Sequence, residues 1–203
     1  DGVPITESIN HSRKMRELLS YLILHRGRPV PQTDLCEALW PDDNNDNPAG
    51  ALKTLLYRTR GLLSAQVGGL PLILSQRGAY AWNPDIPCEV DVERFDALCQ
   101  RVKDDGLPPE ERLALYREAV SLYKGDFLPK LSAELWVVPL TTYYHSLYLQ
   151  TVRGFGGLLL ESENFSELVD IATRALKIDS LDEGLYCLVV EAYLREGNIG
   201  AAL

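Results

Sequence analysis

The spacing of hydrophobic residues in the first part of the chain predicts two helices joined by a turn. Apolar residues recur at helical spacing over Met15–Ile23, which predicts a first helix that ends before Gly27. A shorter apolar face over Leu35–Leu39 predicts a second helix, which Pro41 ends. The segment 28–31 between them contains two prolines, and we expect it to form a turn.

A longer helix and a hairpin are expected next. Asn47 can cap a helix, and Pro48 fits its first turn because the missing N–H needs no partner there. The inner face of this helix is expected to contain Leu52, Leu55, Leu56, Thr59, Leu62 and Leu63. Two apolar segments, Leu70–Ser75 and Ala79–Trp82, then predict a hairpin. This order is typical of a winged helix-turn-helix, whose third helix enters a major groove about 12 Å wide.

The second part of the chain has the periodicity of a helical domain. Helices are expected at about 91–104, 109–124, 132–162, 164–177 and 181–196. Five residues near the end form the pattern of a tetratricopeptide helix pair: Leu188, Ala192, Tyr193, Gly197 and Ala201. We therefore predict a mainly α protein with a small β wing. A winged helix-turn-helix domain is expected over 1–84 and a tetratricopeptide-like all-helical domain over 89–203.

An aromatic stripe lies within the expected helix 132–162. It consists of Tyr143, Tyr144, Tyr148 and Phe155. Such a stripe serves either as packing in a core or as the wall of a ligand pocket, and we favour core packing because buried aromatic residues at helical spacing usually have that role.

Net charge differs between the two parts of the chain. The 203 residues carry a net charge of −9, which by itself argues against nucleic acid as a partner. Residues 1–83, however, hold 9 Lys+Arg and 8 Asp+Glu, whereas residues 84–203 hold 11 and 21. The negative charge therefore belongs to the helical part, and this asymmetry indicates two domains with different partners.

The sequence offers little chemistry for catalysis. It contains neither a G-x-S-x-G motif nor a P-loop, and its three histidines are scattered, so we expect no enzyme, no metal and no cofactor. The four cysteines lack metal-site spacing and are expected to be free and mostly buried. No run approaches the roughly 20 apolar residues of a membrane span. We expect a cytoplasmic protein without membrane contact.

Several segments resemble the SARP-type bacterial transcriptional activators. The resemblance in the first part rests on five segments in order: Arg13–Leu19, His25–Val30, Asp34–Trp40, Ala51–Leu63 and Gly78–Tyr80. In the second part, three features resemble the bacterial transcriptional activator domain of that family: Glu89–Phe95, Ala119–Leu128 and Trp136. The resemblance implies binding to promoter DNA, including direct repeats, contact with RNA polymerase, and a helical module for dimerisation or regulation.

Candidate functional residues follow from the predicted elements. Candidates for base contacts lie on the exposed face of the third helix: Lys53, Thr54, Tyr57 and Arg58. Candidates for phosphate or wing contacts are Arg13, Lys14, Arg16, Arg28, Gln32, Thr33, Arg60 and Arg77, with Arg60 alternatively pairing inside the protein. The resemblance further implies that the loop before the third helix touches polymerase, through Asp42, Asp43 and Asp46.

Two other functions remain open at this point. The first part has a net charge of only +1, the Asp42–Asp46 loop repels phosphate, and Gly50 and Gly61 stand where the family often has polar or basic residues. A protein-interaction scaffold with a DNA-inactive winged helix is therefore one alternative, and a small-molecule sensor using the aromatic stripe is another. The ordered motifs favour a sequence-specific DNA-binding regulator, in that family an activator. Because the chain lacks an initiator Met and stops inside a predicted helix, we expect a fragment cut at both ends, which lacks N-terminal strands of the first domain and the C-terminal part of the second.

Overall fold

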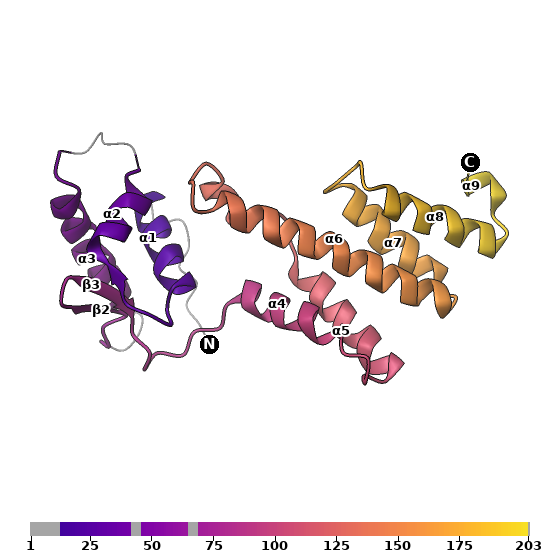
Figure 1. Cartoon of the computed structure of the whole chain (residues 1–203), viewed down its shortest axis with the longest axis horizontal. Coiled ribbons are helices and arrows are strands. Elements are labelled where there is room, and N and C mark those ends of the chain that lie inside the picture. Colours follow the sequence, from indigo (N-terminus) through magenta and orange to yellow (C-terminus); the bar gives the residue numbers. More distant parts are fainter. Residues whose placement is uncertain (1–12, 42–45, 65–68, 203) are drawn as a thin grey trace. The chain divides into compact units, whose positions relative to one another are not determined.

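The computed structural model describes residues 13–41, 46–64 and 69–202 (Figure 1). The chain divides into two compact units between Cys88 and Glu89. The first unit contains α1 (Arg13–Leu24), β1 (Val30–Pro31), α2 (Gln32–Leu39), α3 (Pro48–Ser64), β2 (Ile73–Gln76) and β3 (Ala79–Trp82). This order confirms the predicted mainly helical unit with a small β wing.

The first unit has a three-stranded antiparallel sheet in the order β1-β3-β2. The prediction of a simple turn at 28–31 was wrong, because Val30 pairs with Tyr80 and Pro31 with Ala79. A strand of two residues is too short to show the alternation of apolar and polar residues, and a proline is uncommon in a strand. Pro31 is tolerated because β1 lies at the edge of the sheet, where a missing N–H leaves no gap in the ladder.

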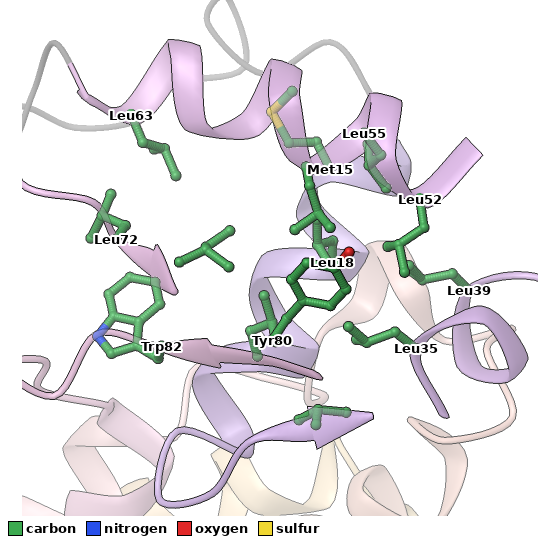
Figure 2. Close-up of a cluster of buried hydrophobic side chains, with 14 residues drawn as sticks. Met15, Leu18, Leu35, Leu39, Leu52, Leu55, Leu63, Leu72, Tyr80 and Trp82 are labelled. Carbon is green, nitrogen blue, oxygen red and sulfur yellow. The ribbon is translucent and has the colours of Figure 1, made fainter. Parts of the chain in front are cut away.

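The core of the first unit lies between the three helices and the sheet. Figure 2 shows side chains from α1, α2, α3, β3 and the segment before β2 that point into a common interior. Leu18, Leu35 and Leu52 in this core are fully buried. The prediction that Leu62 also faces the core was wrong: Leu62 is 39% exposed, and Leu63 takes the core position at the end of α3. The cap of α3 was predicted correctly, since the Gly50 N–H donates to Asn47 Oδ1 at 2.9 Å.

The second unit consists of helices. These are α4 (Asp91–Arg101), α5 (Pro109–Leu122), a 3₁₀ turn (Pro129–Leu131), α6 (Val138–Glu161), α7 (Phe165–Leu176), α8 (Glu183–Glu196) and α9 (Ile199–Ala202). The long helix predicted from residue 132 begins only at Val138, because Pro139 suits a first turn and not a helix interior. Helix α6 packs against α4, α5, α7 and α8, which makes it the central helix of this unit.

An ion pair connects α6 to the start of α8. The Asp182 side chain caps α8 by accepting from the Leu185 N–H at 3.1 Å. The same carboxylate accepts a hydrogen bond from Arg153 of α6. Only 4% of the Asp182 side chain is exposed, so Arg153 compensates a buried negative charge.

The aromatic stripe belongs mostly to the core. Tyr144, Tyr148 and Phe155 are buried, which confirms the preference for core packing at these three positions. Tyr143 differs: it is 44% exposed and its hydroxyl donates to Asp96 at 2.8 Å. The prediction of mostly buried cysteines holds for Cys99 but was wrong for Cys187, which is exposed. Within residues 13–41, 46–64 and 69–202, no helix has the length and apolar character needed to cross a membrane.

Candidate nucleic-acid interface

One face of α3 is buried and the opposite face is exposed. Leu52, Leu56 and Thr59 are at most 2% exposed and fix the orientation of the helix. The four base-contact candidates all lie on the exposed face: Lys53, Thr54, Tyr57 and Arg58. Their spacing of one, four and five residues from Lys53 places them along one stripe of the helix. The structure therefore brings these side chains together on an open surface.

These four residues differ in the chemistry they offer to a base edge. Lys53 and Arg58 are donors suited to the O6 and N7 acceptors of guanine. The Thr54 hydroxyl already donates to the Gly50 carbonyl at 3.1 Å, which leaves its methyl group and an acceptor lone pair for recognition. Tyr57 is 80% exposed, so most of its ring is open to solvent.

Arg60 has a partner inside the protein. Its Nε donates to the Ile73 carbonyl at 3.1 Å, and the side chain is half-buried. This contact ties α3 to the start of β2. Of the two roles expected for Arg60, the geometry favours pairing within the protein.

Lys14 is also engaged within the protein, in contrast to the expected phosphate contact. Its Nζ lies 2.8 Å from Glu17 Oε2, and the Glu17 side chain is fully buried. The same ammonium donates to the Leu39 carbonyl at the end of α2 and lies 5.8 Å from the centroid of the Trp40 ring. Lys14 therefore joins α1 to α2. The neighbouring candidates differ: Arg13 is exposed and Arg16 is half-buried.

The start of α2 is attached to the wing. The backbone N–H of Gln32 donates to the Gly78 carbonyl at 2.9 Å, so this amide serves the protein and not a phosphate. The Thr33 hydroxyl donates to Asp34 Oδ1 at 3.0 Å, and Thr33 itself is exposed. Arg28 lies exposed in the turn before β1. Of Arg28, Gln32 and Thr33, Arg28 is the residue with a positive charge open to solvent, and it is therefore the best placed of the three for a phosphate contact.

The wing ends in a two-residue turn with unusual backbone angles. Arg77 has φ +48° and Gly78 has φ +80°, which is the type I′ geometry that matches the twist of a hairpin. Arginine rarely adopts a left-handed conformation, because its Cβ crowds the backbone. Arg77 is exposed, so the strained backbone position carries a guanidinium group that is open to solvent.

We predict opposite effects of Arg77→Gly on stability and on DNA affinity. Glycine removes the steric cost of the positive φ and is expected to raise the free energy of unfolding of the first unit by about 0.5–1 kcal/mol. Loss of the cation is expected to weaken DNA binding several-fold. Urea unfolding and fluorescence anisotropy measure the two effects. Arg77→Ala is the matched control, since it removes the same charge and keeps the strain; equal stability of the two variants contradicts the prediction.

The loop before α3 is only partly described. Asp42 and Asp43 lie outside the described residues, whereas Asp46 is exposed directly before α3. Sequence reasoning missed a pocket of about 300 Å³ beside the second half of α3, lined in part by Tyr57, Gly61 and Leu70. Leu70 is 53% exposed. This pocket lies between α3 and the segment that leads into β2, so the periodicity of α3 alone does not indicate it.

Comparison with known proteins gives consistent results for both units. Residues 90–203 match the family described as bacterial transcriptional activator domain, and residues 6–79 match the family described as transcriptional regulatory protein, C terminal. Among solved structures, the chain is similar to Mycobacterium tuberculosis EmbR in complex with a low affinity phosphopeptide, with 19% identity and a TM-score of 0.74. The match covers 98% of this chain and 52% of that one, so the chain spans about half its length. No curated protein matches.

Proposed function

We propose, from the premise that this chain belongs to the bacterial transcriptional activator domain family, that it is a sequence-specific DNA-binding regulator of transcription. Helix α3 reads base edges in the major groove, and the wing and α1 contact the phosphates on either side. The observation that carries the proposal is the exposed stripe of Lys53, Thr54, Tyr57 and Arg58 on a helix whose other face is buried. A helix held in this way presents its polar face as a rigid unit.

The second unit is proposed to serve dimerisation or control. Residues 89–203 carry most of the negative charge of the protein, so their partner is a protein and not DNA. Since the first unit is nearly neutral, tight binding needs a second copy on a direct repeat or a contact with RNA polymerase. Asp46 and the neighbouring Asp42 and Asp43 form the proposed polymerase contact. We propose that the protein acts in the cytoplasm and does so without enzymatic activity, cofactor or metal.

Selection of bound sequences from random DNA tests this function. The 203-residue chain is expected to enrich a sequence motif, and the logarithm of its affinity is expected to fall linearly with the logarithm of salt concentration. Enrichment of no motif, together with an affinity that salt does not change, would support the rival function of a protein-interaction scaffold.

A gain-of-function variant provides a further prediction. Gly61 lies on the exposed stripe of α3, and a Cβ added there meets nothing within 4 Å. Gly61→Lys is expected to raise DNA affinity several-fold through one added phosphate contact, and to raise helix stability by about 0.7 kcal/mol. Gly61→Ala, which gives a similar helix gain without the charge, is the matched control. Equal DNA affinity of the two variants, measured by anisotropy, would place Gly61 away from the DNA.

A further inference from the structure

The second unit contains a pocket of about 340 Å³ that DNA binding does not use. It lies between the start of α4, the end of α5, the loop that follows α5, and α6. Four aromatic residues line it: Phe95 of α4, Tyr123 and Phe127 of the segment after α5, and Tyr144 of α6. A pocket of this size suits a small organic group.

The aromatic lining is held in place by the core. The ring centroids of Phe95 and Tyr123 lie 6.0 Å apart, those of Phe95 and Tyr144 6.5 Å apart, and those of Phe127 and Tyr144 5.2 Å apart. Phe95, Phe127 and Tyr144 are each at most 9% exposed. The rings contact one another in a continuous series, so the pocket is formed before any ligand arrives.

Three charged residues also line the pocket. Asp91 and Asp126 carry negative charge, and Lys124 carries positive charge; all three residues are exposed. The Asp126 carboxylate lies 3.7 Å from the His145 ring, and its side chain is 58% exposed. Two carboxylates against one ammonium give the lining a net negative charge.

The pKa values of two lining tyrosines are raised, in part by nearby carboxylates. Burial, together with the nearby charge of Asp126, raises the pKa of Tyr123 to about 12. Burial raises the pKa of Tyr144 as well, and Asp96, Glu93 and Asp91 add to that shift. Burial is the larger cause of both shifts and disfavours any charge; the carboxylate contribution is the part that disfavours an anion specifically.

We propose that this pocket binds an organic cation, with an alkylated ammonium group against the four rings and facing Asp91 and Asp126. Aromatic rings attract a desolvated cation, and the carboxylates neutralise its charge. A neutral apolar ligand gains nothing from the carboxylates, and an anion is repelled by them. The ammonium group can come from a free small molecule or from a lysine side chain of another protein.

Binding of choline and of its uncharged isostere 3,3-dimethylbutan-1-ol tests the proposal. The 203-residue chain is titrated with each compound, and ligand-observed NMR gives the dissociation constants. Choline is expected to bind about tenfold more tightly, since only its charge differs. Equal affinities, or no binding of choline, would overturn the proposal.

Two exposed loop residues provide variants with opposite expected effects. Asp126→Asn is expected to weaken choline binding about threefold or more, whereas Lys124→Gln is expected to strengthen it by a similar factor. Neither change is expected to alter the affinity for the uncharged isostere. Asp105→Asn, an exposed carboxylate outside the pocket lining, is the matched control. A common direction for the Asp126 and Lys124 variants, or no effect of either, contradicts the proposal.

A peptide titration distinguishes the two sources of the ammonium group. The probes are the capped tripeptide Ala-Lys-Ala and its form with Nε-trimethyllysine. Tighter binding of either peptide than of choline supports a protein partner, and tighter binding of choline supports a small molecule. Both outcomes support an ammonium site.

Discussion

Replacing Lys53 and Arg58 together by alanine is expected to reduce affinity for a selected DNA site about 100-fold or more. Each side chain is a donor on the exposed stripe of α3, and a base contact of this kind contributes roughly 1–3 kcal/mol of discrimination. Sequence preference is expected to relax at the base pairs that the two residues contact. Anisotropy titrations with the selected site and with a scrambled site measure both effects.

A control variant with two charges removed from the second unit distinguishes a loss of base recognition from a general loss of positive charge. Lys103→Ala/Arg195→Ala removes one lysine and one arginine at exposed positions of that unit. Its affinity for the selected site is expected to stay close to that of the unmodified chain. If the two double variants weaken binding equally, α3 is not the recognition helix.

Replacing Lys14 by methionine is expected to destabilise the first unit by about 2–3 kcal/mol. The change keeps the apolar stem but removes the ammonium that pairs with buried Glu17 and with the Leu39 carbonyl. Loss of one partner from a fully buried pair costs about 3–5 kcal/mol, and a lower value is expected here because the Lys14 side chain is 34% exposed. Urea unfolding, followed by hydrogen exchange at α1 and α2 amides, measures the loss.

Two variants test this interpretation of Lys14. Arg13→Ala, at an exposed position of the same turn, is expected to change stability by less than about 0.5 kcal/mol and to lower the salt dependence of DNA binding. Lys14→Met/Glu17→Met is expected to recover part of the lost stability, because the buried carboxylate is removed as well. A Lys14 variant that keeps full stability and lowers the salt dependence would restore Lys14 as a phosphate contact.

The orientation of α3 could be predicted from the sequence because it depends on local periodicity. Leu52, Leu55 and Leu56 define a buried face, and that face determines which side the polar residues occupy. The N-cap at Asn47 was predictable for a similar reason, since its partner is the amide of Gly50, three residues away. A helix and its exposed stripe follow from residues that are neighbours in the chain.

The roles of single charged residues could not be predicted in this way. Lys14 reaches a carbonyl 25 residues away, and Arg60 reaches one 13 residues away. Both contacts depend on how helices and strands pack, which no local pattern encodes. The aromatic pocket is a similar case: Tyr144 belongs to a stripe visible in the sequence, but Phe95, Tyr123 and Phe127 reach it from other segments.

The contact between Arg153 and Asp182 bears on how the second unit unfolds. In a linear array of repeats, the last helices can open while the others stay folded. Opening of α8 here separates Arg153 from a carboxylate that is 96% buried in the folded unit, and it also removes the cap of α8. Helix α6 also packs against α4, α5 and α7, so this ion pair joins α8 to the central helix of the unit. Opening of α8 is therefore expected to cost more free energy than the fraying of a terminal helix that lacks such a contact.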